Sequence, residues 1–287
     1  MNINKGIILA GGVGTRLSPL TKCVNKQLLP LYDKPLIFYP LSILMLAGIR
    51  NILIIINRGQ RKNFFNLLGN GARYGLKITY KIQKEPKGIA DAFILGRSFI
   101  KKDSVALILG DNFFYGQSFT DKLLNAKNKN TGATIFIKEV KNPENFGVAV
   151  INKSKITRII EKPKKIISKF AITGLYFFDS NVVNIAKKIK PSKRNELEIT
   201  EVLNLYKKIN KLNYEKIGRG AIWSDAGNIV DLNNLSSFVH SVERVQNIKI
   251  ACIDEIALNQ GWITRKQIKN NIIFYGNCHY ANYLKIL

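Results

Sequence analysis

The chain has 287 residues, of which 46% are hydrophobic, and this is enough for a substantial core in one large domain or two fused ones. No run approaches the roughly 18 consecutive apolar residues of a membrane-spanning helix, and an apolar strand pattern, not a signal peptide, follows Met1. We therefore expect a cytoplasmic protein without a membrane role. The few scattered thiols and imidazoles argue against a disulfide framework and a thiolate or imidazole metal site; they are Cys23, Cys252, Cys278, His240 and His279.

The formal net charge of +26 raises the question of nucleic-acid binding. The basic residues are 34 lysines and 11 arginines, spread over the whole length without the basic and aromatic alternation of stacking surfaces. Recognition of bases and phosphates favours arginine, because its planar fork binds two acceptors at once. Lysine shares A/T-rich codons with the abundant asparagine and isoleucine, so the base composition of the gene accounts for the charge. We expect no nucleic-acid partner.

Four short apolar runs predict buried strands, and two helical segments lie between the first three; the strands are 6–10, 52–56, 105–109 and 133–137, and the helices lie near 36–48 and 89–100. This alternation predicts an α/β fold with a mainly parallel sheet and helices on both faces. Ligands of such sheets bind beyond the carboxyl ends of the strands. The segment 35–49 is too apolar for a surface helix, so we expect it to be buried and to end near Gly48.

From about residue 140 the pattern changes to shorter strands with two helical segments; the strands are 148–151, 156–160 and 174–178, and the helices are 181–189 and 198–208. After Asp231 the chain is mostly helical, with an amphipathic helix over 232–245. We expect a main domain over 1–230, with halves at about 1–139 and 140–230. A mostly helical C-terminal cap is expected over 231–287.

The first predicted strand leads into a glycine-rich turn in the stretch LAGGVGTRL, residues 9–17. Glycines at 11, 12 and 14 allow positive φ and close backbone approach, and Arg16 and Lys26 add cationic donors, which together suit a nucleotide polyphosphate. An ordinary strand-to-helix turn is the alternative. The spacing of the glycines matches neither G-x-x-x-x-G-K-[ST] nor G-x-G-x-x-G. This argues against assigning the chain to the P-loop NTPases or to the dinucleotide-binding proteins.

Nearly the whole chain resembles the sugar-nucleotide pyrophosphorylases, because that family's motifs follow in order; they are LAGGVGTRL, NKQLLPLYDKPLIFYPLSILMLAGI, YKIQKEPKGIADAF, ALILGDNFFYG, NPENFGV, EKPK, ITGLYFFD, KRNELEIT, GRGAIWSDAG and ACIDEIA. The resemblance implies a Rossmann-like mixed sheet with nucleotide-binding and sugar-binding halves. It also implies that dTTP and glucose 1-phosphate react to give dTDP-glucose and pyrophosphate, with Mg²⁺ as cofactor and a homotetramer as the assembly. UTP or another sugar 1-phosphate, or a catalytically weakened regulatory protein, are the alternatives.

The resemblance assigns the metal to Asp111 and Asp225 and the triphosphate to Arg16 and Lys26, which makes these four the expected catalytic residues. Mg²⁺ commonly takes one or two protein carboxylates and completes its octahedron with phosphate oxygens and water. On local sequence alone Asp111 could cap a helix, Asp225 could belong to a turn and Lys26 could be a solvated surface lysine.

The remaining assignments by resemblance concern substrate recognition. The nucleotide-binding set is Leu9, Gly11, Gly12, Gly14, Thr15, Arg16, Lys26, Gln27, Gln83 and Gly88, in which Gln83 and Gly88 recognise the base. The sugar-phosphate set is Gly147, Glu161, Lys162, Ile172 and Arg194. A glutamine amide matches the N3–H and carbonyl of thymine and of uracil equally well. Without the resemblance, Gln83 could be a plain exposed strand residue.

Four positions depart from the family pattern: Ala226 stands where threonine is usual, Phe146 for tyrosine, Asp91 for glutamine and Asn195 for glycine. The loss of a hydroxyl at Ala226 removes one group that could orient Asp225. Family members often carry a second nucleotide-sugar site at a subunit interface. Arg219, Glu255 and Ile256 lie in motifs linked to that site.

Overall fold

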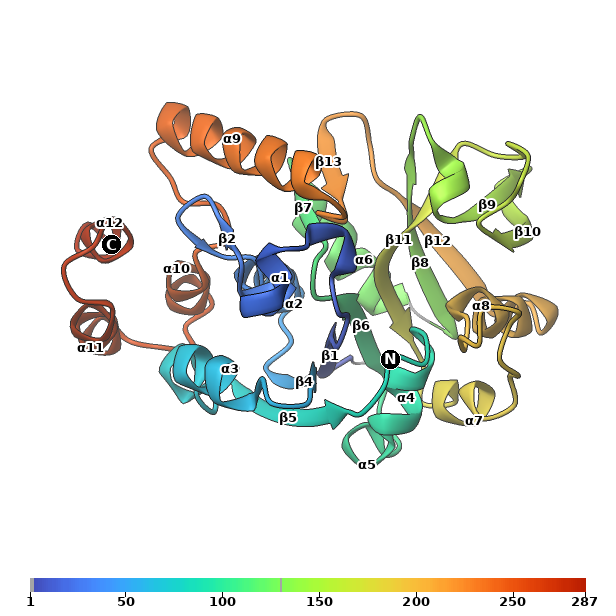
Figure 1. Cartoon of the computed structure of the whole chain (residues 1–287), viewed down its shortest axis with the longest axis horizontal. Helices are drawn as coiled ribbons and strands as arrows, with labels where there is room; N and C mark the ends of the chain where they lie inside the picture. Colours follow the sequence, from blue (N-terminus) through green and yellow to red (C-terminus); the bar gives the residue numbers. More distant parts are fainter. Residues whose placement is uncertain (1–2, 130) are drawn as a thin grey trace.

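The computed structural model describes residues 3–129 and 131–287. Its strands are β1 (Lys5–Ala10), β2 (Pro30–Leu31), β3 (Lys34–Pro35), β4 (Asn51–Asn57), β5 (Lys77–Gln83), β6 (Val105–Leu109), β7 (Phe113–Gly116), β8 (Ala133–Glu139), β9 (Gly147–Asn152), β10 (Lys155–Glu161), β11 (Phe170–Phe178), β12 (Leu212–Lys216) and β13 (Ala221–Ser224). The main sheet has the order β10-β9-β11-β6-β1-β4-β5, with β8 paired to β11 and β12 to β8 (Figure 1). Two short antiparallel pairs, β2 with β3 and β7 with β13, lie outside it.

The strands β6, β1, β4 and β5 run parallel, so that Ile8 lies between Ile54 and Ile108 across the sheet. Their carboxyl ends therefore share one edge. Strand β11 pairs antiparallel with β6, β8 and β9, and this reversal joins the parallel half to the half formed by β8–β12. The expected α/β fold is confirmed, as are the strands expected at 6–10, 52–56, 105–109 and 133–137.

Helices cover both faces of the sheet because its strands are apolar on both sides. The helices are α1 (Leu20–Cys23), α2 (Phe38–Leu46), α3 (Arg61–Leu68), α4 (Asp91–Leu95), α5 (Arg97–Ile100), α6 (Phe119–Lys129), α7 (Val182–Ala186), α8 (Ile199–Lys208), α9 (Ile229–Gln246), α10 (Ile253–Asn259), α11 (Arg265–Tyr275) and α12 (His279–Leu284). Ile8 and its neighbours pack against α2, α3, α6 and α10, whereas Ile7 and its neighbours pack against α4, α5, α7 and α8. No helix in the described part of the chain is long and apolar enough to cross a membrane.

Helix α2 confirms the expected buried helix, because eight of its nine residues, from Phe38 to Met45, are buried between the sheet and α10. The chain leaves it through Gly48, whose φ of +70° lies in the left-handed region that favours glycine. The single helix expected near 89–100 is wrong: the structure has α4 and α5, divided at Gly96. A Cβ there would lie 3.0 Å from Ile7 Cδ1 and 2.9 Å from the main-chain oxygen of Ala92, so glycine permits a close approach to β1.

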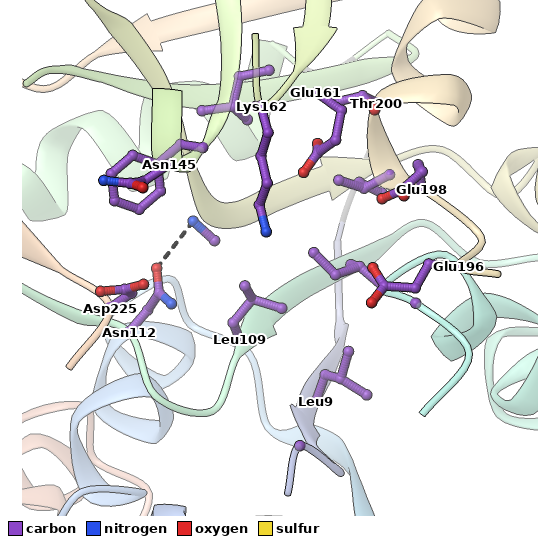
Figure 2. A pocket seen from close by; sticks show the side chains of 18 of the residues that line it. Leu9, Leu109, Asn112, Asn145, Glu161, Lys162, Glu196, Glu198, Thr200 and Asp225 are labelled. Carbon is purple, nitrogen blue, oxygen red and sulfur yellow. Dashed lines mark hydrogen bonds between the residues drawn. The ribbon is translucent and has the colours of Figure 1, made fainter. Parts of the chain in front are cut away.

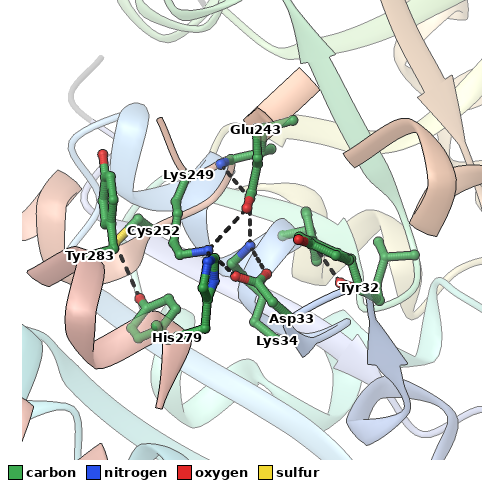
Figure 3. Close-up of polar contacts among 12 residues, drawn as sticks. Tyr32, Asp33, Lys34, Glu243, Lys249, Cys252, His279 and Tyr283 are labelled. Atoms are coloured by element: carbon green, nitrogen blue, oxygen red, sulfur yellow. Dashed lines mark hydrogen bonds and ion pairs between the residues drawn. The ribbon is translucent and has the colours of Figure 1, made fainter. Parts of the chain in front are cut away.

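The C-terminal helices α9–α12 lie beside the α2 and α3 side of the sheet, and α9 spans the expected boundary at residue 230 (Figure 1). A buried charge network ties this region to the turn between β2 and β3 (Figure 3). Glu243 on α9 accepts hydrogen bonds from Lys34 at 2.9 Å and from Lys249 at 3.1 Å, and Asp33 pairs with both lysines. Burial tends to raise the pKa of Asp33, but Lys34 and Lys249 outweigh burial and lower it.

Candidate active site

A cavity of about 1020 Å³ opens beyond the carboxyl ends of β1 and β6 and continues to β9, β10 and the start of α8. Most of the expected site residues line it: Leu9, Gly12, Thr15, Arg16, Gln83, Gly88, Gly147, Glu161, Lys162, Ile172, Arg194 and Asp225. Five others do not line the cavity itself: Gly11, Gly14, Lys26, Gln27 and Asp111. Figure 2 shows Lys162 extending into the cavity, between Asp225 and Asn112 on one side and Glu196 on the other.

The glycine-rich stretch forms a compact loop that a single 3-10 turn, Thr15–Leu17, follows. Gly14 has a φ of +68°, and a Cβ there would lie 2.9 Å from Thr21 Cγ2, so both backbone and space require glycine. Thr21 Oγ1 donates a hydrogen bond of 2.9 Å to the main-chain oxygen of Gly14 and fixes the loop. The alternative of an ordinary strand-to-helix turn is therefore wrong, because the turn leads to no long helix. Arg16 is 70% exposed and points back toward Asp225, with 3.9 Å between Nη2 and Oδ2.

Lys26 lies between the two aspartates. Its Nζ donates hydrogen bonds to Asp111 Oδ2 at 2.6 Å and to the main-chain oxygen of Asp225 at 3.3 Å, and the residue is only 5% exposed. The interpretation of Lys26 as a solvated surface lysine is thus wrong. Asp111 lies in the turn between β6 and β7, so it caps no helix. Asn112 Nδ2 donates to Asp111 Oδ1 at 3.0 Å and holds the carboxylate from its other side.

The electrostatics show that the two carboxylates interact. Burial raises the pKa of Asp225, and repulsion by Asp111 raises it further, whereas Lys26 and Arg16 lower it. Among the described residues, no group of three or more histidines, cysteines, aspartates and glutamates could hold a metal by itself. Two interacting carboxylates fit Mg²⁺ as a site that ligand phosphates and water complete.

Gln83 is the last residue of β5 and is 4% exposed, so its interpretation as an exposed strand residue is wrong. Its Nε2 donates a hydrogen bond of 3.0 Å to Asp91 Oδ2. Gly88 has a φ of +96°, and a Cβ there would lie 2.5 Å from the main-chain oxygen of Leu197. Leu197 N donates to Lys87 O at 2.7 Å, so the loop that carries Gly88 is fastened to the other half of the molecule.

At the opposite end of the cavity, Glu161 ends β10 and faces Gly147 at the start of β9. Lys162 follows with a φ of +42°, which is a strained conformation for a side-chain-bearing residue, and its N–H donates to Phe146 O at 3.1 Å. Strained residues of this kind often occur at functional sites. Burial and then Glu198 raise the pKa of Glu161, whereas Arg194 and Lys162 lower it.

Arg194 lies among carboxylates. Its Nη2 is 2.9 Å from Glu198 and 3.3 Å from both Glu161 and Glu196. Glu196, Glu198 and Thr200 also line the cavity but were not predicted as site residues. Their position in the KRNELEIT motif was the signal that could have identified them. Asn112 and Trp223 were missed in the same way: Asn112 Oδ1 accepts hydrogen bonds from Trp223 Nε1 at 2.7 Å and from Gly174 N at 3.0 Å.

Comparison with known proteins identifies the relatives of this chain. The family model described as nucleotidyl transferase matches residues 5–242. The glucose-1-phosphate thymidylyltransferase of Neisseria meningitidis serogroup A is 48% identical over 281 residues, which are 98% of each chain. That of Xanthomonas campestris pv. campestris is 45% identical over 288 residues, which are 100% of this chain and 98% of the relative. The chain belongs to the nucleotidyl transferase family.

Solved structures of nucleotidyl transferase relatives share the fold. A Bacillus anthracis protein crystallised in complex with sucrose has a TM-score of 0.76 and 40% identity, and the match covers 82% of this chain and 94% of that one. A UDP-glucose pyrophosphorylase complexed with UDP-glucose has a TM-score of 0.74 and 26% identity, with coverage of 84% and 99%.

Two of the departures from the family pattern, Asn195 and Phe146, have local explanations in this nucleotidyl transferase. Asn195 has a φ of +59°, and asparagine is the residue that best replaces glycine in this region. Phe146 lies against Trp223 with 5.0 Å between ring centroids, so its ring packs without needing a hydroxyl. Ala226 is fully buried in an apolar cluster, with a φ of +41°. Of the residues linked to a second site, Arg219 is exposed, while Glu255 and Ile256 lie on α10.

Proposed function

We propose that this protein transfers the thymidylyl group of dTTP to α-D-glucose 1-phosphate, giving dTDP-glucose and pyrophosphate. The observation that carries the proposal is one continuous cavity with a glycine loop and a buried amide at one end, and with Glu161, Lys162 and Arg194 at the other. Asp225 also lines the cavity, Lys26 links it to Asp111, and we place the meeting point of the two phosphate-bearing substrates beside this pair. The names of the Neisseria and Xanthomonas relatives support the same activity.

We assign different residues to the binding of each substrate. We assign the triphosphate to the glycine loop and Arg16, the base to Gln83 and Gly88, and the sugar phosphate to Lys162 with Arg194. Glu161 and Gly147 would contact sugar hydroxyls, Leu9 and Ile172 would shape the walls, and Gln27 would support the nucleotide end from behind the cavity wall. Arginine suits the departing pyrophosphate, because its fork binds two oxygens.

The reaction needs no nucleophile from the protein. A sugar phosphate is already anionic near neutral pH, so its oxygen can attack the α-phosphate of dTTP directly, with pyrophosphate as the leaving group. The protein would then act by aligning the two reactants and by placing cationic groups where charge accumulates. Lys26 and Arg16, which face the aspartates, supply such charges.

We assign Mg²⁺ to Asp111 and Asp225. When bound, the ion would neutralise negative charge at the reacting phosphate. Lys26 and Asn112 would orient Asp111 through the hydrogen bonds they already make to it.

We further propose a homotetramer that acts in the cytoplasm, where dTTP and sugar phosphates are available. Several large apolar side chains on C-terminal helices are exposed enough to lie in a subunit interface: Val245 is 80% exposed and Ile273 is 78% exposed.

The test is pyrophosphate release over a matrix of dTTP, UTP, dCTP and dATP against several sugar 1-phosphates. We expect dTTP with glucose 1-phosphate to be fastest and UTP to be slower but active, because one methyl group is worth about 1–3 kcal/mol of discrimination. Faster turnover with UTP or with another sugar 1-phosphate would reassign the substrate. Binding without turnover for every pair would favour a regulatory protein, the alternative that Ala226 keeps open.

A further inference from the structure

Two buried polar side chains meet beside the glycine loop. Gln83 ends β5 and is 4% exposed, while Asp91 begins α4 and is 8% exposed. Gln83 Nε2 donates a hydrogen bond of 3.0 Å to Asp91 Oδ2. The proposed function assigns Gln83 to the base but gives Asp91 no task.

The chemistry of this pair determines which way the amide faces. An amide has a donor side and an acceptor side, whereas an ionised carboxylate only accepts hydrogen bonds. If the Gln83 amide were reversed, its oxygen would face the carboxylate oxygens of Asp91 in a buried setting without a proton between them. Reversal would therefore leave polar groups unpaired where water cannot replace the lost bond.

The acceptor side of the amide lies over Gly11. A Cβ at Gly11 would overlap Gln83 Oε1, so the absence of a side chain there gives the oxygen its space. No hydrogen bond to Oε1 is found from the residues that the structure describes. Gln83 lines the cavity together with Gly12 and Gly88, and Oε1 is the polar atom of its amide that Asp91 leaves unpaired.

We propose that Asp91 is a positioning residue that orients the Gln83 amide so that the site accepts the N3–H of thymine or uracil and rejects cytosine. Cytosine carries an acceptor at N3 and an amino group where thymine has a carbonyl, so it mismatches the amide at both places. The second N–H of Nε2 remains free to donate to the thymine carbonyl. The inference rests on the proposed function only in placing the base at Gln83.

The main variant is Asp91→Asn, which keeps the size of the side chain but can either accept from or donate to Gln83. Two readouts are used: the ratio of kcat/KM for dTTP over dCTP, and the ratio of affinities for dTDP and dCDP by calorimetry, which needs no turnover. We expect Asp91→Asn to lower both ratios about tenfold or more, since a well-oriented bidentate contact discriminates bases by this order. Asp121→Asn is the matched control, because it also removes an acidic residue from the first turn of a helix, α6.

A double-mutant cycle shows whether Asp91 acts through Gln83. In a Gln83→Ala background, Asp91→Asn should change neither ratio further. Gly11→Ala is the second variant, which displaces Oε1 from the opposite side and should lower the same ratios even if Asp91→Asn does not fold.

The proposal is overturned if the folded Asp91→Asn or Gly11→Ala protein keeps its selectivity within twofold, or if Asp91→Asn lowers it equally without Gln83. Equal binding of dCDP and dTDP by the unmodified protein would also overturn it, and turnover of dTTP would then leave the proposed function intact. Conversely, absence of dTTP turnover together with selective dTDP binding would refute the proposed function and keep the role of Asp91.

Discussion

Lys26 Nζ donates a hydrogen bond of 2.6 Å to Asp111 Oδ2, although 85 positions separate the two residues in the sequence. The same ammonium group contacts the main chain at Asp225, so one buried cation connects the loop after β1 with both aspartates. This contact places a positive charge beside two carboxylates that repel each other.

Replacing Lys26 with methionine should lower kcat by at least about 10²-fold, because it removes a preorganised positive charge from the reacting region. Lys26 lowers the pKa of Asp225, so its loss should raise that pKa and move the acid side of the pH–rate profile to higher pH. The measurement is kcat against pH, with the exposed Lys22→Met as the control. An unchanged pH–rate profile with near-normal turnover would contradict a role of Lys26 in catalysis.

Lys162→Met should raise the KM for the sugar 1-phosphate about tenfold or more and change the KM for dTTP less than twofold. The reason is position: Lys162 follows Glu161 at the end of β10, and its N–H donates to Phe146 O, whereas the glycine loop follows β1. Initial rates with each substrate varied in turn provide the test, and the exposed Lys165→Met serves as the control. Equal weakening of both substrates would contradict the assignment.

Trp223 should report on ligand binding by fluorescence. The chain has two tryptophans, of which Trp223 lines the cavity and packs against Phe146, while Trp262 lies outside it against Arg50. In a Trp262→Phe variant, titration with dTDP-glucose should change the remaining emission and saturate. A response carried only by Trp262, measured in Trp223→Phe, would place the ligand elsewhere.

Asp33→Asn should destabilise the fold by about 3 kcal/mol at neutral pH, because it leaves Lys34 and Lys249 buried with one carboxylate between them. The folded-state pKa of Asp33 is lowered, so its contribution is present above its ordinary value of 3.8 and is lost as pH falls through the folded value. The difference from the unmodified protein should therefore shrink below about pH 4.

Urea unfolding at several pH values measures this effect. Asp103→Asn is the control, since Asp103 is 57% exposed and its partner Lys5 keeps hydrogen bonds to two main-chain oxygens. That change should cost less than about 1 kcal/mol. A loss at Asp33 no larger than at Asp103, or one independent of pH, would show that the buried network contributes little.

Strands β1, β4 and β6 of the parallel half were predictable, because each contains an uninterrupted run of apolar residues. Strand β5 and helix α3 were not predicted. In β5, which lies at the edge of the sheet, only Ile78 and Gln83 are buried, so the strand lacks a regular alternation of apolar and polar residues. The break at Gly96 also escaped prediction, because it depends on contact with Ile7 from another strand.

The sequence motifs predicted which residues belong to the candidate site, but not which side chains contact one another there. Sequence placed Arg194 with the sugar phosphate, yet it could not show that three glutamates already surround the guanidinium. Nor could it show that Asp91 meets Gln83, since this depends on how β5 and α4 pack. The tolerance of asparagine at position 195 became understandable only from its positive φ.

The turnover of Asp225→Asn as a function of Mg²⁺ concentration tests most directly whether Asp111 and Asp225 hold a catalytic metal ion. The substitution keeps size and removes charge, so the fold should persist while kcat falls by at least about 10²-fold, as expected for lost metal charge stabilisation. Asp111→Asn should behave alike, and the double variant should lose little more, because groups that act as one unit are not additive. EDTA should abolish the activity of the unmodified protein and Mg²⁺ restore it. Near-normal turnover of Asp225→Asn at limiting Mg²⁺ would contradict the two-carboxylate site and leave Asp225 as a turn residue.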